Sequence, residues 1–267
     1  MFDPLISAGI FSLLVLFLTR FHTGGFFLTL RKGSVMGSWV AMSEEGGSDF
    51  SGYLCLPPSG RGPGLLLIQE IWGVNAHIRA MANAYAAEGF VVLAPDVFWR
   101  QQARIDLTYD DAGIEQAYKH YNALDMNQAC DDLGRAVEYL KGCEFVEGRL
   151  GVLGYCLGGT LAYSLAANEH LSAGVSYYGS GIGGMLNKTP RMAFPFLFHF
   201  AGDDHLIAMG EVTRLQPLLK ATGNANFRIY EGQRHGFNCV ERSSYSMEAA
   251  LLAKAGTLRF LAQHLVR

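Results

Sequence analysis

Short apolar runs alternate with amphipathic segments along most of this chain. Continuous apolar runs are typical of strands buried on both faces of a sheet, and apolar residues at helical spacing are typical of helices that pack on it. We therefore predict strands at Ser34–Met42, Phe50–Leu56, Gly64–Ile68, Phe90–Ala94, Arg149–Leu153, Ala173–Tyr178, Phe196–Ala201 and Asn226–Tyr230. We predict helices at Ala76–Ala87, Asp110–Ala123, Met126–Leu140, Gly159–Ala167, Val212–Ala221 and Ser246–Leu265. The predicted turns and loops are Ser43–Asp49, Pro57–Pro63, Val97–Thr108, Gly179–Pro195 and Gly232–Ser244.

Strands that alternate with helices favour a parallel sheet covered by helices on both faces. The predicted fold class is therefore α/β, with a mostly parallel central sheet. No internal repeat or low-complexity segment interrupts the pattern after residue 34. We expect residues 34–267 to form a single domain.

Composition excludes several classes of function. The chain has 267 residues, half of them hydrophobic, which is enough for a large core. Its formal net charge of −3 gives no reason to expect nucleic-acid binding. The five cysteines are odd in number and form no C-x-x-C pair, so we predict neither a disulfide framework nor a zinc site, and no cofactor. A reducing compartment, the cytoplasm, fits this cysteine usage best.

The N-terminal 33 residues do not fit the α/β pattern. Leu5–Leu18 is an apolar run of 14 residues, whereas a membrane span needs about 20. A signal peptide has a basic first region, but Asp3 is the charged residue that precedes this run. A membrane anchor, an export signal and an extension upstream of a start at Met36 or Met42 remain alternatives. We favour the extension, and expect membrane contact only if residues 1–33 are retained.

The stretch Leu150–Thr160 carries the clearest candidate chemistry. An apolar run ends at Gly154, Cys156 follows, and Gly158 precedes a helical run. Strand, sharp turn and helix make up the nucleophile elbow G-x-S-x-G, here with cysteine in place of serine. A thiol at a helix N-terminus favours its thiolate form. The alternative is a buried structural cysteine in an ordinary turn.

Two further residues lie just beyond later strands, where the ligands of such sheets bind. His235 follows the last predicted strand in a Gly-flanked loop and is a candidate general base for the thiol. Asp204 follows the strand Phe196–Ala201 and is a candidate to orient the imidazole, although the adjacent Asp203 is an equal alternative at this point. A solvated loop histidine and turn-capping carboxylates are the alternatives without chemistry. The chain order nucleophile, acid, histidine is that of α/β-hydrolases.

With these residues in view, the chain resembles the dienelactone hydrolase (carboxymethylenebutenolidase) family from about Phe50 to Leu265. The stretch Gln-Glu-Ile-Trp-Gly-Val-Asn at 69–75, together with Gly-Tyr-Cys-Leu-Gly-Gly at 154–159, is specific for this family rather than for α/β-hydrolases at large. Further matches are Ala-Pro-Asp at 94–96, Tyr-Tyr-Gly at 177–179, Leu-Asn-Lys at 186–188, Asp-His at 204–205, Tyr-Glu at 230–231 and His-x-Phe at 235–237.

The resemblance implies an α/β-hydrolase fold and a Cys156, His235 and Asp204 triad, and it selects Asp204 over Asp203. It also gives Glu70 a role, since this carboxylate contacts the nucleophile in the family and helps to form the thiolate when substrate binds. A buried carboxylate bonded to a neighbouring arginine is the structural alternative for Glu70. The backbone N–H groups of Leu157 and Ile71 would form the oxyanion hole.

The family's substrate is an enol-lactone that bears a carboxylate, which two arginines bind. Arg100 matches one of them, with a surface salt bridge as the alternative. Cys239 stands where the other is expected. Arg234 or Arg242 could supply that charge from nearby; the alternatives are a weaker selectivity for carboxylates and a different substrate.

The predicted pocket walls are Trp72, Tyr109, Tyr177 and Tyr178, unless these aromatics are plain core. We expect a monomeric hydrolase that opens a small-molecule lactone or related ester through a thioester acyl-enzyme. A general carboxylesterase or thioesterase with a non-anionic substrate is the alternative.

Overall fold

The computed structural model describes residues 37–42 and 50–266, without the side chains of residues 188–191. These residues form an eight-stranded sheet in the order β1-β2-β4-β3-β5-β6-β7-β8. The first two pairs, β1 with β2 and β2 with β4, are antiparallel, and every later pair is parallel. The strands are β1 Ser38–Ala41, β2 Ser51–Cys55, β3 Gly62–Ile68, β4 Val91–Pro95, β5 Val146–Tyr155, β6 Leu171–Tyr177, β7 Phe196–Ala201 and β8 Ala225–Tyr230.

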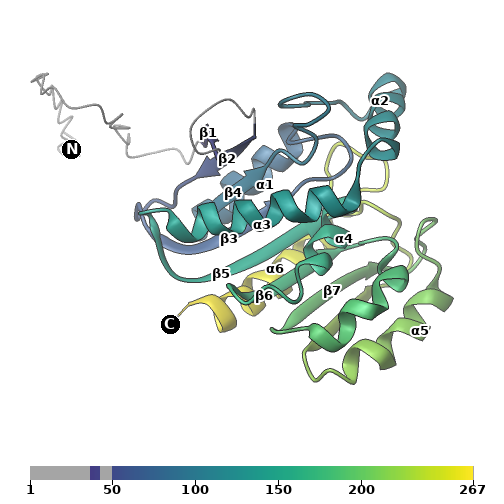
Figure 1. Cartoon of the computed structure of the whole chain (residues 1–267). Helices are drawn as coiled ribbons and strands as arrows, with labels where there is room; N and C mark the ends of the chain where they lie inside the picture. The colour runs from purple at the N-terminus through teal and green to yellow at the C-terminus, as the bar shows by residue number, and fades with distance from the viewer. Residues whose placement is uncertain (1–36, 43–49, 267) are drawn as a thin grey trace, which may run out of the picture. The chain divides into compact units, whose positions relative to one another are not determined.

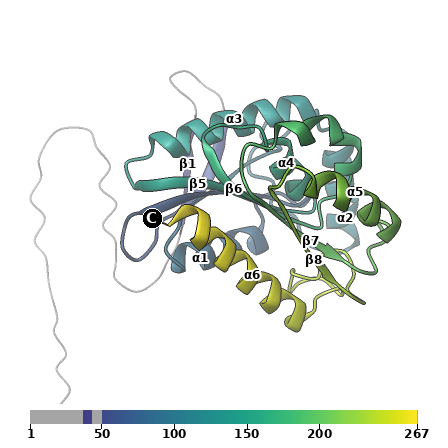
Figure 2. The same ribbon diagram turned by 90° about the horizontal axis from the view of Figure 1, so that it is seen from below.

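Helices cover both faces of this sheet (Figure 1). Viewed from below, α1 and α6 lie on one face, and α3, α4 and α5 lie on the other (Figure 2). The helices are α1 Ala76–Ala87, α2 Asp111–Asn122, α3 Met126–Gly142, α4 Leu157–Ser164, α5 Met209–Lys220 and α6 Met247–Leu265. The predicted α/β class with a mostly parallel sheet is confirmed.

The central parallel strands β3, β5 and β6 have their carboxyl ends at the same level of the sheet, because the last residues of these strands are paired with one another. Ile68 at the end of β3 pairs with Gly154 of β5, and Tyr155 pairs with Tyr177 at the end of β6. All residues from Leu150 to Tyr155 are buried, as expected for a strand with helices on both faces. The segments that follow β3, β5 and β6 therefore begin close together in space.

Several bounds in the structure differ from the sequence-based ones; β5, for example, begins at Val146 rather than at Arg149. The stretch Gly179–Pro195 is not all loop, since it contains 3-10 helical turns, η1, at Ile182–Arg191, with a kink at Met185 between them. Such short tight helices serve as connectors and need no long apolar periodicity, so a Gly- and Pro-rich composition concealed it. Helix α4 begins at Leu157, two residues before the predicted start at Gly159, because the chain turns directly from Cys156 into the helix. The predictions for residues 1–33 and for the turn Ser43–Asp49 lie outside the described residues.

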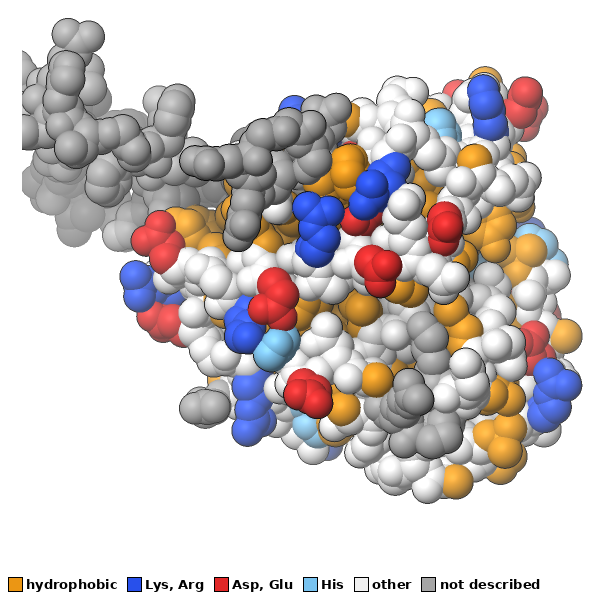
Figure 3. Space-filling model, in the orientation of Figure 1, with side chains coloured by type: hydrophobic (Ala, Val, Ile, Leu, Met, Phe, Trp, Pro, Cys, Tyr) orange, Lys and Arg blue, Asp and Glu red, His pale blue; other side chains and the backbone are white. Residues whose placement is uncertain are grey.

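No helix in the described part of the chain is long and apolar enough to cross a bilayer. On the face drawn in Figure 3, basic and acidic side chains are interspersed rather than sorted by sign. This pattern agrees with the near-balanced charge of the sequence, and that face has no continuous basic surface of the kind that binds a polyanion.

Candidate active site

Cys156 lies at a strained turn between β5 and α4. Its backbone has φ of 53° and ψ of −116°, outside the regions that L-residues commonly adopt. The turn is held from both sides, because the Cys156 amide donates to the Tyr177 carbonyl at 3.0 Å and its carbonyl accepts from the Gly159 amide at 2.9 Å. A Cβ on Gly154 would overlap the backbone of Gly158. This geometry is that of a nucleophile elbow, and it presents the thiol at the first turn of α4.

His235 and Asp204 form a buried pair in the loops after β8 and β7. His235 Nδ1 lies 2.8 Å from Asp204 Oδ2, and the other carboxylate oxygen accepts the Leu206 amide at 2.8 Å. Both side chains of the pair are buried. The adjacent Asp203 is exposed, so the structure pairs the imidazole with Asp204 rather than with its neighbour.

The electrostatic surroundings of His235 include the thiol. Burial lowers the pKa of the imidazole, but the charge of Cys156 and the hydrogen bond to Asp204 outweigh burial and raise the pKa of His235. His235 Nε2 is buried without a hydrogen-bond partner of normal geometry among the described residues. One nitrogen is thus anchored to the carboxylate, and the other remains available on a ring that interacts with Cys156.

Two backbone amides near the elbow are free to bind an anion. Neither the amide of Leu157, the first residue of α4, nor that of Ile71, which follows β3, donates a hydrogen bond within the described part of the chain. First-turn amides of a helix have no intrahelical partner. These are the two donors that the family resemblance assigns to the oxyanion hole.

Glu70 is fully buried directly after β3. Its Oε2 accepts the Tyr109 hydroxyl at 2.9 Å. Its Oε1 lies 3.6 Å from Nη1 of Arg242 and has no hydrogen-bond partner among the described residues. Glu70 is therefore held by one hydrogen bond and one loose ion pair. The ion pair with Arg242 corresponds to the structural alternative for Glu70, a buried carboxylate beside an arginine.

Arg242 is the arginine that faces this group. Burial lowers its pKa, but the charge of Glu70, followed by those of Tyr178 and Cys156, raises it. The guanidinium lies over the Trp72 ring, 5.1 Å from its centroid. Gly236 has φ of +81°, and a Cβ there would overlap the guanidinium, so glycine allows the arginine to approach the His235 loop. Arg234, the other candidate, instead donates to the Ser243 carbonyl at 2.8 Å.

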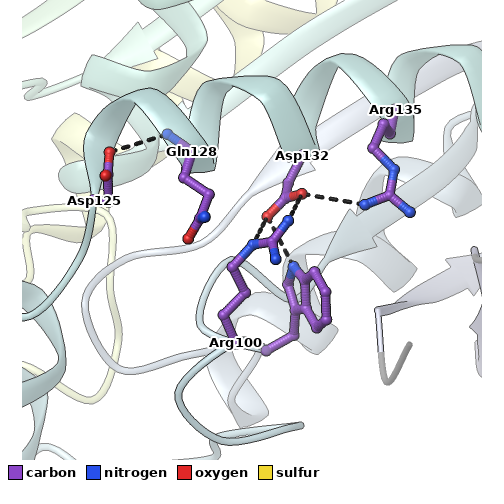
Figure 4. Close-up of polar contacts among 6 residues, drawn as sticks. Arg100, Asp125, Gln128, Asp132 and Arg135 are labelled. Atoms are coloured by element: carbon purple, nitrogen blue, oxygen red, sulfur yellow. Dashed lines mark hydrogen bonds and ion pairs between the residues drawn. The ribbon is translucent and has the colours of Figure 1, made fainter. Parts of the chain in front are cut away.

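Arg100 is bound to a carboxylate of the protein itself. Its Nε and Nη2 donate to the two oxygens of Asp132 on α3 at 2.9 and 2.8 Å (Figure 4). Arg135 also reaches this aspartate, at 3.3 Å. A cavity of about 60 Å³ beside Arg100 has Asp125 and Gln128 in its wall, and Cys156 does not line it. Among the described residues, the ion pair of Arg100 is with Asp132, which is the salt bridge that the sequence leaves as the alternative role of this arginine.

The four predicted pocket aromatics lie in three different settings. The Tyr178 ring lies 4.9 Å from the His235 ring, and its buried hydroxyl has no partner among the described residues. Trp72 and Tyr109 pack together at 4.6 Å and contact the Glu70 and Arg242 side chains through the interactions above. Tyr177 turns its hydroxyl to Thr257 of α6 at 2.7 Å, so it supports the elbow through its backbone carbonyl and the core through its ring.

The sequence did not identify His77, which lies beside Glu70 together with Cys239. Ligand atoms of Glu70, His77 and Cys239 all lie within 4.8 Å of one another, and all three residues are buried. Burial lowers the pKa of His77 against the opposing charge of Glu70, and burial together with Glu70 raises the pKa of Cys239 to about 11. His77 is the second residue of α1, so helical periodicity alone gave it no distinguishing feature.

The chain is similar to known proteins over most of its length. The family model described as the dienelactone hydrolase family matches residues 50–265. A carboxymethylenebutenolidase of Pseudomonas putida is 33% identical over 224 residues, which cover 84% of this chain and 95% of the relative. A carboxymethylenebutenolidase of Cupriavidus pinatubonensis is 31% identical over 227 residues, with 84% and 95% covered. The crystal structure of a putative dienelactone hydrolase from Klebsiella pneumoniae superposes with a TM-score of 0.76 at 24% identity, covering 87% of this chain and all of that one.

Proposed function

This chain belongs to the dienelactone hydrolase family, with the α/β-hydrolase fold, and we propose from that membership that it opens lactones through a cysteine thioester. It is a hydrolase of carboxylic esters or lactones. We propose which residue is the nucleophile, which residues form the acid–base pair, and which class of substrate the enzyme hydrolyses.

One observation carries the assignment of the nucleophile. Cys156 lies on the strained elbow, and its charge is the main influence that raises the pKa of an imidazole whose Nδ1 is already bound to Asp204 at 2.8 Å. A histidine held in one orientation beside a thiol matches the roles of nucleophile, base and orienting acid. We assign these roles to Cys156, His235 and Asp204.

The reaction proceeds as acyl transfer. The Cys156 sulfur attacks the lactone carbonyl carbon, and the Leu157 and Ile71 amides bind the oxyanion that forms. Collapse of this intermediate breaks the ring C–O bond and leaves an enolate on the same molecule, now attached as a thioester. The proton lost by the Cys156 thiol passes to this enolate. A water then gives a proton to His235 as it attacks the thioester, and the imidazolium returns that proton to the departing Cys156 sulfur. No metal or organic cofactor takes part in these steps.

Arg242 and Glu70 suggest how an anionic substrate takes part in its own activation. The Arg242 Nη1 atom has no hydrogen-bond partner among the described residues and is 3.6 Å from Glu70. A guanidinium binds a carboxylate in bidentate fashion. A substrate carboxylate at Arg242 competes with Glu70 for this cation, and a buried carboxylate that loses its cation gains affinity for a proton. The released Glu70 then accepts the proton of the Cys156 thiol.

The state of Arg100 favours a second candidate, a carboxylesterase or thioesterase with a neutral substrate. Arg100 is bound to Asp132 through two hydrogen bonds, and a cysteine occupies position 239, so the anion site has one arginine where the family resemblance implies two. A panel of lactones with and without a carboxylate separates the two candidates by their kcat/KM values.

The nucleophile is tested with Cys156→Ala. We expect hydrolysis of both lactones and nitrophenyl esters to disappear while the circular dichroism spectrum and the unfolding midpoint stay close to those of the parent. Full hydrolysis by this variant contradicts the mechanism, because no other group in it attacks the carbonyl.

A further inference from the structure

Three buried side chains with different metal-binding chemistry meet beside the candidate active site. A carboxylate oxygen of Glu70, an imidazole nitrogen of His77 and the sulfur of Cys239 all lie within 4.8 Å of one another. They come from the end of β3, the start of α1 and the loop after β8. Carboxylate, imidazole and thiolate are the three ligand types that Zn²⁺ accepts, with bonds of about 2.0–2.3 Å. Ligands at such bond lengths in a tetrahedron lie close together, so only small side-chain movements would close the site.

Two of these three residues carry polar atoms that the protein leaves unsatisfied. His77 is 2% exposed, and its Nε2 is buried without a hydrogen-bond partner among the described residues. Glu70 is 0% exposed, and its Oε1 has no hydrogen-bond partner there either. Buried polar atoms are nearly always hydrogen-bonded, so each of these two residues has a buried atom that lacks the partner a bound ligand would supply.

We propose that Glu70, His77 and Cys239 bind a divalent transition-metal ion of the Zn²⁺ class, and that the bound ion inhibits the hydrolase. The three ligands do not include Cys156, although Glu70 belongs to both sites, and the proposal departs from the sequence-based expectation of no metal site. That expectation rested on cysteine pairs close in sequence, whereas these ligands are brought together only by the fold.

The charges of the site suit such an ion. On binding, the Cys239 S–H proton leaves to solvent as the metal–sulfur bond forms, and His77 binds through a neutral imidazole nitrogen. One carboxylate and one thiolate then offset the two charges of the ion. The nearby Arg242 opposes a second cation, but it contacts Glu70 only through an ion pair of 3.6 Å without a hydrogen bond.

Inhibition follows if Glu70 has its proposed role, and this part of the inference rests on the proposed function. A carboxylate bound to a metal no longer accepts the proton of Cys156. Metal binding itself does not depend on that role, so the two claims are measured separately.

Binding is measured by titrating the full chain with Co²⁺ and recording the thiolate-to-metal charge-transfer band. We expect one ion per chain, retention of the band in Cys156→Ala and in the control Cys143→Ser, and its loss in Cys239→Ser. We expect His77→Phe, which keeps an aromatic ring at this position, to weaken binding at least about tenfold, since removal of a ligand costs far more than removal of an outer-shell partner. A band that persists in Cys239→Ser, or that disappears in Cys156→Ala, overturns the site and places the metal elsewhere.

Inhibition is measured with Zn²⁺ on a carboxylate-bearing enol-lactone, the substrate whose hydrolysis uses the proposed proton transfer to Glu70. We expect Zn²⁺ to inhibit the parent and Cys143→Ser, and inhibition to be relieved in Cys239→Ser and His77→Phe. Full activity with Co²⁺ or Zn²⁺ bound at Cys239 overturns the inhibitory role of the ion. Failure of the proposed function is recognised independently, by hydrolysis that persists in Cys156→Ala.

Discussion

Asp204 Oδ2 accepts a hydrogen bond from Nδ1 of His235 at 2.8 Å, across 31 positions of the sequence and with both side chains buried. The bond fixes which ring nitrogen carries the proton and leaves Nε2 for other chemistry. Because Leu206 donates its amide to the second carboxylate oxygen, the acid is itself held in place.

Asp204→Asn tests this orienting role. The amide keeps the size of the side chain but removes the charge that stabilises an imidazolium and selects the tautomer. We expect kcat to fall by roughly 10³-fold, with little change in the unfolding midpoint, by analogy with orienting acids in other triads. The matched control is Asp203→Asn, one position earlier and exposed, for which we expect near-parental kcat. Equal losses in the two variants would remove Asp204 from the mechanism.

Gly154→Ala tests the packing of the elbow. The added Cβ overlaps the backbone of Gly158, which has no flexible end to move aside. We expect a loss of about 1–3 kcal/mol or more in the free energy of unfolding, measured in urea. Gly134→Ala is the control, since a Cβ in that part of α3 meets nothing within 4 Å. Because alanine favours the helical conformation more than glycine does, Gly134→Ala should raise the free energy of unfolding by about 0.5–1 kcal/mol. We therefore expect the two variants to change the free energy of unfolding in opposite directions.

Arg242→Gln and Arg100→Ala decide which arginine binds a substrate carboxylate. We expect Arg242→Gln to raise KM for a carboxylate-bearing lactone about tenfold or more while KM for a neutral ester changes little, since a charge-assisted hydrogen bond contributes about 1.5–3 kcal/mol. Arg242→Lys keeps the positive charge but not the bidentate geometry of the guanidinium, so its KM for the carboxylate-bearing lactone should lie between those of the parent and Arg242→Gln. Arg100→Ala should lower the free energy of unfolding, because it leaves buried Asp132 without its bidentate partner, and it should leave KM for both substrates nearly unchanged. A selective rise in KM for Arg100→Ala alone would return the anion site to the sequence-based assignment.

His199 makes the fold sensitive to acid. Burial lowers the pKa of His199 to about 3, and both ring nitrogens lie within hydrogen-bond distance of hydroxyls, Tyr230 at 2.8 Å and Thr257 at 3.0 Å. The folded state therefore binds a proton less readily than the unfolded chain. The stabilisation is complete above the ordinary histidine pKa of about 6.5 and is lost as pH falls from there toward 3. His199→Phe should show lower stability at pH 7 but a shallower decline between pH 6.5 and 4 in urea unfolding; an unchanged slope would exclude His199 as the titrating group.

The sequence was sufficient for much of the fold because its strong patterns are local. Continuous apolar runs such as Phe196–Ala201 fixed strands whose bounds are the same in the structure. Glycines around Cys156 predicted a tight turn from stereochemistry alone. The 3-10 helix at Ile182–Arg191 escaped prediction because its backbone follows local turns rather than a buried periodic face.

The site was less predictable where side chains from distant segments must meet. The sequence allows a surface salt bridge for Arg100, but it does not identify the partner, because Asp132 lies 32 positions away on a helix face with no distinguishing motif. Arg242 was one of two equal candidates until the loop after β8 placed it beside Glu70. The meeting of Glu70 with His77 and Cys239 depends on the arrangement of three segments at one edge of the sheet, which no local pattern encodes.

The thioester on Cys156 is the central claim, and a rapid-quench mass measurement tests it most directly. The parent protein is mixed with a carboxylate-bearing enol-lactone, stopped in acid within the first turnover, and digested for peptide mapping. We predict a mass increase equal to the whole lactone on the peptide that contains Cys156, released by neutral hydroxylamine and absent from Cys156→Ala. A lactone adduct on any other residue, or turnover of the lactone with no adduct at any quench time, would contradict the account.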